Sequence, residues 1–212
     1  MSIPQTIYTP DHQLFRSTVK KFIEREIAPF HAQWEKDGVV DRNLWRRAGE
    51  AGLLCTSIPA QYGGGDGDFL HSAIVTEELS RAVFNGPGFR VHSDIAAFYI
   101  LNHGDEVQRT KWLPRMASGE TVAAIAMTEP GAGSDLQGIR TTAIRDGDCF
   151  VVNGSKTFIT NGQLADLVIL ACKTDPRAGS KGISLLLVEA DSVGFARGRN
   201  LEKLGMKAQD TS

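Results

Sequence analysis

The spacing of apolar residues along this chain of 212 residues changes near residue 120. Before that point the spacing is helical. Thr9-Pro10-Asp11 predicts a helix start, with a capping hydroxyl and a proline in the first turn, and apolar side chains then recur at helical spacing from Leu14 to Ile27. Asp41 is a second N-cap candidate. Further helices are predicted at about residues 74–82, 89–101 and 106–117, with glycine-rich breaks at 63–67 and 86–88.

After Gly119 the apolar residues form short runs or alternate, which is typical of strands. Asp146-Gly147-Asp148 is a hairpin turn signal. The segments that predict strands are 121–128, 139–145, 149–152, 165–173 and 182–189. Helices followed by strands predict an α+β fold with two segregated domains, a helical one over residues 1–120 and a β domain over 121–212.

Composition and charge narrow the class of protein. The formal net charge is −2, from 23 basic and 25 acidic residues, which gives no reason to expect a nucleic-acid partner. No apolar run approaches the ~20 residues of a membrane span. Residues 1–5 show no signal peptide or transit pattern, so we expect a cytoplasmic protein. The scattered Cys55, Cys149 and Cys172 suit small core hydrophobes, and the dispersed histidines predict no metal site.

The turn after the first predicted strand is a candidate ligand site. The strand ends at Thr128, and Gly131 and Gly133 would let a ligand approach the backbone closely. Ser134 and free backbone N–H groups of the turn could grip an anion such as a pyrophosphate. The spacing fits neither GxGxxG nor the P-loop, and a strand follows where a Rossmann fold needs a helix. Taken from these residues alone, a structural β-turn is an equally good interpretation.

A second turn, at Phe158-Ile159-Thr160-Asn161-Gly162, favours the ligand site. An aromatic ring at Phe158 can stack on a planar cofactor, or it can simply pack in the core. The Thr160 hydroxyl can donate a hydrogen bond to the same cofactor.

The stretch "MTEPGAGSD" followed by "FITNG" resembles the paired flavin-binding signature of the acyl-CoA dehydrogenase family. The likeness covers the whole chain, and "GPGFRVHS" and "KAQDTS" are most similar to the long-chain acyl-CoA dehydrogenases. The resemblance implies an all-α N-terminal domain followed by a mostly antiparallel, barrel-like β-sheet middle domain. The family's C-terminal helical domain would begin after the last residue here.

The resemblance also assigns roles to individual residues. FAD would lie across the β domain, and Ser134 would touch both FAD and the acyl-CoA substrate. The implied FAD contacts are Ile125, Ala126, Met127, Thr128, Gly131, Gly133 and Ser134 from the first turn, and Phe158, Ile159 and Thr160 from the second. The implied acyl-CoA contacts are Ser134, Ser180 and Lys181, with Val91 and His92 at the wall of the acyl-chain pocket. For His92 a structural role is the stronger interpretation.

The implied reaction is α,β-dehydrogenation of a fatty acyl-CoA to a trans-2-enoyl-CoA in fatty acid β-oxidation. A base removes the α-proton while the β-hydride passes to the flavin. In the family that base is a glutamate of the C-terminal domain, so we name no catalytic residue and expect the chain alone to be inactive. Electron-transferring flavoprotein is the implied electron acceptor, and full-length relatives are homotetramers.

Two other functions fit the same residues. The chain could work as it stands, as a non-catalytic module that binds flavin or acyl-CoA. Alternatively, the parent protein could be an acyl-CoA oxidase or a flavoprotein similar to nitroalkane oxidase. Oxygen reactivity of the reduced flavin would distinguish an oxidase from a dehydrogenase.

Overall fold

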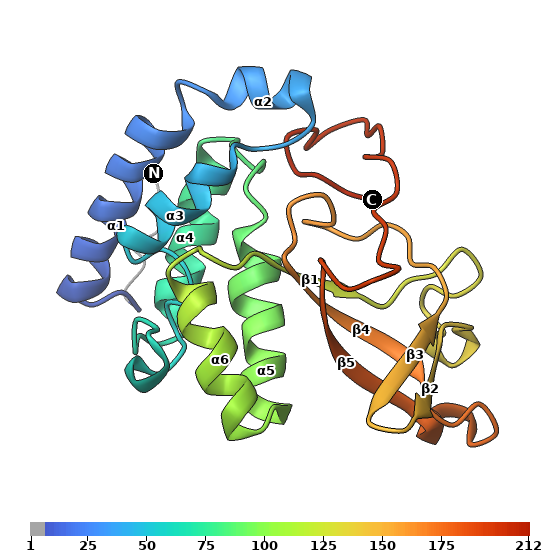
Figure 1. Ribbon diagram of the computed structural model, residues 1–212. Coiled ribbons are helices and arrows are strands. Elements are labelled where there is room, and N and C mark those ends of the chain that lie inside the picture. The colour runs from blue at the N-terminus through green and yellow to red at the C-terminus, as the bar shows by residue number, and fades with distance from the viewer. Residues whose placement is uncertain (1–6) are drawn as a thin grey trace.

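The computed structural model describes residues 7–212, with helices in the first part of the chain and strands in the second (Figure 1). Residues 1–6, on which the expectation of no signal peptide rests, lie outside the described residues. The α-helices are α1 (Pro10–Phe22), α2 (His31–Asp37), α3 (Arg42–Glu50), α4 (Phe69–Arg81), α5 (Ala97–His103) and α6 (Glu106–Ala117). The strands are β1 (Ala123–Ala126), β2 (Thr142–Asp146), β3 (Cys149–Asn153), β4 (Leu167–Lys173) and β5 (Ile183–Glu189). The predicted α+β order is confirmed.

The predicted helix starts are confirmed by their caps. The Thr9 hydroxyl accepts from the His12 N–H, and Pro10 occupies the first turn of α1. The Asp41 carboxylate accepts from the Asn43 N–H at 2.7 Å and begins α3. Both side chains satisfy backbone donors that the first helical turn leaves without a partner.

Two segments predicted as ordinary helix contain π-helical turns. The first, η1 (Ile23–Ile27), continues α1, and the second, η3 (Val91–Ala96), precedes α5. A π turn adds a residue to the helical repeat, so neighbouring side chains rotate to new faces. Such turns are frequent at functional sites, and η3 lies directly against β1.

The sheet is mixed and open (Figure 1). β4 is flanked by β1, which runs parallel to it, and by β5, which runs antiparallel. β2 and β3 form the predicted hairpin, and β2 meets β4 only where Thr142 pairs with Lys173. Antiparallel pairing predominates, as expected, but the parallel β1–β4 pair makes the sheet mixed, and because the sheet is open the description "barrel-like" is loose. The reason is that β4 lies between its own sequence neighbour β5 and the distant β1, which no local turn signal could reveal.

The helices and the sheet share a core. Trp112 and Met116 of α6 pack in one cluster with Leu167 and Ile169 of β4. A hydrogen-bonded link reinforces the junction, because the Arg42 guanidinium bridges Glu120 O and the Asp166 carboxylate, both at 2.6 Å. The candidate site is thus built on a rigid junction.

The C-terminal segment returns to the helices at the top of Figure 1. The Asn200 amide donates to Gly38 O at 2.6 Å, and the Glu35 carboxylate accepts from the Ala208 N–H at 2.9 Å. At its end, Ser212 exchanges backbone hydrogen bonds with Ile159. The last residues therefore brace the second candidate turn.

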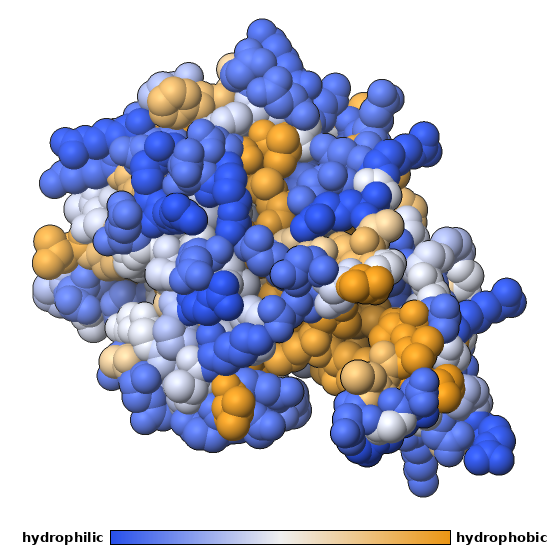
Figure 2. All heavy atoms as spheres, viewed as in Figure 1, coloured by the Kyte–Doolittle hydropathy of each residue, from blue (hydrophilic) through white to orange (hydrophobic). Residues whose placement is uncertain are grey.

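The strands carry exposed apolar side chains on both faces of the sheet. Ile144 on β2, Phe150 and Val151 on β3, and Leu185 on β5 are among them. Apolar residues also gather over the strands in the space-filling view (Figure 2). Cys149 lies on this exposed hairpin, so the expectation of a core position is wrong for it. Cys55 and Cys172 are buried as predicted, and burial raises the pKa of the Cys55 thiol to about 12.

Candidate functional site

The two turns that the sequence analysis singles out lie against each other. The first follows directly from the end of β1. The Thr157 N–H donates to Thr128 O at 2.9 Å, and the Lys156 ammonium donates to Met127 O at 2.9 Å. Two motifs that are separate in the sequence therefore form one continuous surface.

A buried ion pair fixes this junction. The Glu129 carboxylate accepts from Lys156 Nζ at 2.9 Å, from the Arg140 N–H at 2.6 Å and from the Thr141 N–H at 2.9 Å. Burial alone would raise the pKa of Glu129, but Thr141, Lys156 and the two backbone N–H groups hold the pKa down to about 2. Glu129 is thus ionised and surrounded by donors, so it is a structural carboxylate and a poor base.

The glycines of the first turn border open space. Glu129 and Ala132 exchange backbone hydrogen bonds of 2.9 and 3.1 Å, which closes a tight turn. A Cβ atom built on Gly131 or Gly133 would meet nothing within 4 Å, and neither residue has a positive φ. In the described chain the N–H groups of Gly133 and Ser134 have no protein acceptor. Nothing within residues 7–212 requires glycine here, whereas a ligand that approaches the backbone would.

The second turn holds Phe158 in a strained and exposed position. Its φ is +59°, a left-handed conformation that is an outlier for a bulky residue, and its side chain is 67% exposed. The interpretation of Phe158 as a core aromatic is therefore wrong. An exposed ring held at a conformational cost is typical of a binding surface.

Asn161, three residues later, is buried and makes contacts inside the chain. Its side chain is 1% exposed, and its amide donates to Gly88 O at 3.1 Å and to Ala123 O at 3.2 Å. It also has a positive φ of 64°, which asparagine tolerates better than most residues. Asn161 thereby ties the start of the η3 segment to β1 and to the second turn.

Beside this turn the helices enclose a cavity of about 320 Å³. Its wall comes from α4, the η3 segment and the C-terminal segment. Thr160 of the second turn also lines it, so one residue belongs to both the turn surface and the cavity. The lining includes Val75, Leu79, Val91, Ile95 and Thr160.

The structure separates the two residues expected at the acyl-pocket wall. Val91 lines the cavity, whereas His92 is fully buried on the other side of η3. His92 Nδ1 accepts from the Ala123 N–H and Nε2 donates to Met116 O, both at 3.0 Å. Burial lowers the pKa of His92 to about 4, so the ring is neutral near pH 7. His92 connects α6 to β1, which agrees with the structural interpretation.

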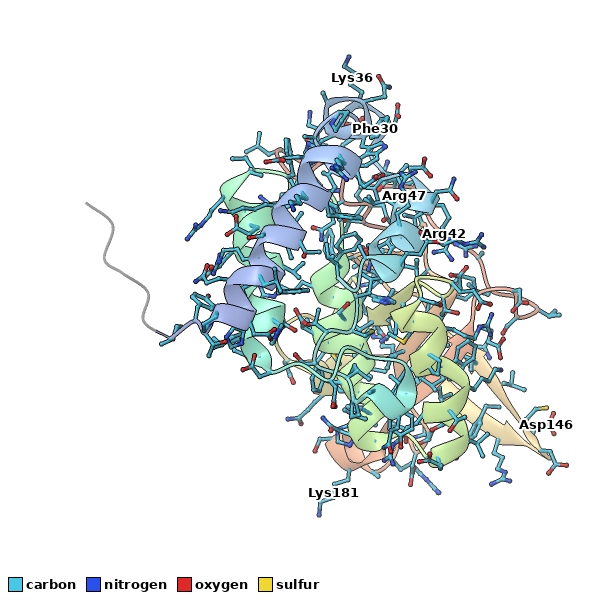
Figure 3. All side chains as sticks on the ribbon, turned by 90° about the vertical axis from the view of Figure 1, so that its left-hand side faces the viewer. Phe30, Lys36, Arg42, Arg47, Asp146 and Lys181 are labelled. Carbon is cyan, nitrogen blue, oxygen red and sulfur yellow. The ribbon has the colours of Figure 1, made fainter. Side chains whose placement is uncertain are left out.

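Ser180 and Lys181 lie in a short 3-10 turn, η5 (Gly179–Gly182), between β4 and β5. Both are exposed, and Lys181 points away from the body of the chain (Figure 3). This turn contacts the similar turn η4 (Leu136–Gly138), which follows Ser134 closely. The structure therefore brings the Ser134 loop and the Ser180–Lys181 loop together at one end of the sheet.

Two glutamates of α4 and the glycine-rich loop at 63–67 make hydrogen bonds or ion pairs within the chain. Glu77 and Glu78 of α4 pair with the buried Arg16 of α1, with an Arg16–Glu77 distance of 2.8 Å. In the glycine-rich loop, the Gly65 and Gly67 N–H groups donate to backbone carbonyls, so this loop is a connector.

One grouping was missed because His12 lies far from Asp68 and His71 in the sequence. His12 and His71 both contact the Asp68 carboxylate, at 3.0 and 2.9 Å, close enough together to hold a metal ion. Each histidine is also the N3 partner in the capping box of α1 or α4, which gives the grouping a structural role.

Comparisons with known proteins decide the family. Residues 9–120 match the acyl-CoA dehydrogenase N-terminal domain, and residues 124–212 match the acyl-CoA dehydrogenase middle domain. The chain belongs to the acyl-CoA dehydrogenase family. The mitochondrial long-chain specific acyl-CoA dehydrogenase of Sus scrofa is 50% identical over 208 residues, which cover 97% of this chain and 48% of that protein. The chain therefore spans about half the length of the curated relatives it matches.

Solved acyl-CoA dehydrogenases share the architecture. The enzyme from Geobacillus kaustophilus is 50% identical, with a TM-score of 0.94 over 97% of this chain and 55% of that one. A glutaryl-CoA dehydrogenase from Mycobacterium smegmatis in complex with FADH2 is 31% identical, with a TM-score of 0.86 over 96% of this chain and 52% of that one.

Relatives in this family carry different substrate names. An isovaleryl-CoA dehydrogenase of Arabidopsis thaliana is 38% identical over 95% of this chain and 50% of that protein. A short-chain specific acyl-CoA dehydrogenase of Clostridium acetobutylicum is 36% identical over 96% of this chain and 54% of that protein. Family membership alone therefore does not fix the acyl group.

Sequence reasoning passed over Lys156, Asn161 and Asp94. Lys156 is an isolated charge directly before "TFITNG", and its burial follows only from its ion pair with Glu129 across the fold. Asn161 precedes a glycine in a turn, which is a signal for left-handed backbone. The position of Asp94 in the cavity wall depends on the π turn, for which the sequence carried no signal.

Proposed function

We propose that this chain is the FAD- and acyl-CoA-binding part of an acyl-CoA dehydrogenase that forms trans-2-enoyl-CoA from a fatty acyl-CoA. The observation that carries the proposal is the joined surface of the two turns, which meets the helical cavity at Thr160. A planar cofactor bound on that surface would lie next to an extended acyl group bound in the cavity. This adjacency is what α,β-dehydrogenation requires.

The residues present fit a flavin. The open backbone at Gly131 and Gly133 and the free N–H groups of Gly133 and Ser134 suit a pyrophosphate. The exposed ring of Phe158 offers a stacking surface. We assign FAD contacts to Ile125, Ala126, Met127, Thr128, Gly131, Gly133, Ser134, Phe158, Ile159 and Thr160. When bound, FAD supplies the hydride acceptor.

For the substrate, we assign Ser134, Ser180 and Lys181 to the CoA moiety and Val91 to the acyl pocket. The contact between the η4 and η5 turns supports the first assignment, since it places these loops together. His92 contributes indirectly, because its ring accepts a hydrogen bond from the Ala123 N–H and so positions the start of β1. We divide the chain into a helical domain, 1–120, and a β domain, 121–212.

A long-chain fatty acyl substrate and a role in β-oxidation are the finer part of the proposal. The 50% identity to a long-chain specific enzyme supports them. Electron-transferring flavoprotein is the proposed electron acceptor, and a homotetramer is the proposed assembly. A similar chain, 35% identical with a TM-score of 0.92, comes from a structure named as the electron transferring flavoprotein of Acidaminococcus fermentans. No helix among residues 7–212 is long and apolar enough to cross a membrane. A cytoplasmic location stays a prediction.

An oxidase is the second candidate function. The prolyl acyl carrier protein oxidase AnaB is 31% identical with a TM-score of 0.87, so an oxidase can share this architecture. Under air, the reduced flavin of an oxidase would reoxidise rapidly with release of hydrogen peroxide, and that of a dehydrogenase would not. Measuring peroxide release during turnover decides between the two.

The test of the proposed function replaces Thr160 with valine in the full reading frame that contains this chain. We expect the anaerobic reduction of bound flavin by acyl-CoA to be slower. Its activation free energy should rise by about 1–3 kcal/mol, because a hydrogen-bond donor at the ring is lost. Thr110→Val, at an exposed position on α6, is the matched control. Equal reduction rates in wild type and Thr160→Val would contradict the assignment.

A further inference from the structure

One side of the helical cavity is polar. Thr56, Ser72, Ser93 and Asp94 all line it. The Thr56 and Ser72 hydroxyls are 2.8 Å apart, and Ser93 Oγ accepts from the Cys55 N–H at 3.0 Å. These side chains come from three segments, the loop before α4, α4 itself and η3, so the polar wall is a feature of the fold.

The π turn η3 explains why a carboxyl group faces the cavity. His92 and Ala96 are buried, and η3 packs against β1. Val91, Asp94 and Ile95 line the cavity on the other face. Asp94, in the middle of η3, is thereby placed beside the space that the acyl group would occupy.

The Asp94 side chain is partly buried in the cavity wall. Burial raises its pKa above the ordinary value, while the neighbouring Ser72 hydroxyl and Arg90 pull the pKa down. Arg90 lies one turn earlier and is exposed, so it marks the mouth of the cavity. Within residues 7–212, Asp94 is the only acidic residue that lines this cavity. A carboxylate has about four acceptor positions, more than the Ser72 hydroxyl can fill, so Asp94 can accept further hydrogen bonds from a ligand in the cavity.

A plain alkyl end would be unfavourable at this wall. It would take the Asp94 carboxylate out of water without offering it a hydrogen bond, and leaving a buried polar group without a partner carries a large free-energy cost. A group that donates a hydrogen bond avoids that cost. Sites built around hydrogen-bonding groups discriminate strongly against analogues that lack the partner group.

We propose that the cavity accepts an acyl group that carries a hydroxyl, bound by Asp94 in the polar wall that Ser72 and Thr56 share. This inference rests on the proposed function, because it takes the cavity as the acyl-binding site. It narrows the proposed fatty acyl-CoA substrate to a hydroxylated fatty acyl-CoA. Arg90 at the mouth is too exposed to select a buried carboxylate, which excludes a dicarboxylic acyl group as the first choice.

The test measures dissociation constants by calorimetry for octanoyl-CoA and 8-hydroxyoctanoyl-CoA on the full reading frame that contains this chain. We expect the hydroxylated thioester to bind about tenfold more tightly. Asp94→Leu should reverse the preference, and Asp94→Asn should retain part of it because the amide oxygen still accepts. Asp191→Leu, at an exposed loop position, is the matched control and should keep the wild-type preference.

The possible results distinguish the hydroxyl preference from acyl-CoA binding itself. Equal binding of the two thioesters, or tighter binding of octanoyl-CoA, would overturn the hydroxyl preference and leave acyl-CoA binding intact. If Asp94→Leu still prefers the hydroxylated thioester, another group binds the hydroxyl, and the proposal is also overturned. Tightest binding of the octanedioic monothioester would assign the site to Arg90. No binding of any thioester by the folded protein would refute the proposed function itself.

Discussion

The helical and the β parts of this chain differ in the kind of binding site that they offer. In the helical part, charged groups are paired inside the chain, as Arg16 is with Glu77 and Glu78. In the β part, the turn at Gly133 has N–H groups without acceptors among the described residues, and Phe158 and Phe150 are exposed. The helical part therefore forms most of a cavity, and the β part presents a turn whose backbone is open to a ligand. Function is expected where the two meet, at Thr160.

The largest expected effect concerns turnover by the 212-residue chain alone. We expect no formation of enoyl-CoA, because the Glu129 carboxylate has a pKa of about 2 and is engaged by Lys156 and two N–H groups. General-base catalysis typically contributes 10²–10⁴-fold, and that contribution would be missing. The measurement is enoyl-CoA production by the chain with FAD and a panel of acyl-CoAs, compared with the full reading frame. Robust turnover by the chain would mean that a base lies within it, and Asp94 would be the first residue to replace.

The next effect tests whether the joined turns depend on the buried ion pair. Lys156→Met should lower the free energy of unfolding by about 3–5 kcal/mol, because it leaves Glu129 buried without its cation. Lys36→Met, at an exposed position on α2, should change it by less than about 0.5 kcal/mol. Urea denaturation of the chain measures both. A loss under about 1 kcal/mol for Lys156→Met would show that the turns are held together by other contacts.

A pH effect of intermediate size tests the junction at His92. Its pKa is lowered to about 4 in the folded chain, below the ordinary value of about 6.5. The unfolded chain therefore binds a proton first as the pH falls, so stability is full above pH ~6.5 and declines toward pH ~4. The shift corresponds to about 3 kcal/mol. His92→Gln should remove this part of the pH dependence, whereas His103→Gln, at an exposed position, should retain it. Parallel pH profiles for wild type and His92→Gln would contradict the account.

The smallest effect concerns strain at Phe158. Phe158→Gly should leave the free energy of unfolding unchanged or raise it by up to about 1 kcal/mol, because glycine adopts a positive φ without steric cost. Phe150→Gly is the matched control, since Phe150 is also exposed but lies in β3. There glycine should destabilise the chain by roughly 0.5–1 kcal/mol. Thermal unfolding compares the two, and a clear loss of stability in Phe158→Gly would show that its ring packs in the fold.

Local signals in the sequence predicted the elements well and their spatial relations poorly. The caps at Thr9 and Asp41 and the hairpin at Gly147 follow from short-range hydrogen bonding and backbone geometry. The parallel pairing of β1 with β4 is a long-range contact that no turn chemistry encodes. The same division holds for the site. The two motifs indicated a ligand surface, but the roles of Lys156 and Asp94 depend on contacts across the fold.

The central claim is that the Gly131–Ser134 turn receives FAD at its open backbone. The direct measurement is the FAD dissociation constant of the full reading frame with Gly133→Val, compared with Gly198→Val. Both glycines border open space and have no positive φ, so neither substitution should change the melting temperature. The account predicts that Gly133→Val weakens FAD binding by tenfold or more, about 1.4 kcal/mol, while Gly198→Val binds as wild type does. Wild-type FAD affinity in Gly133→Val would contradict it.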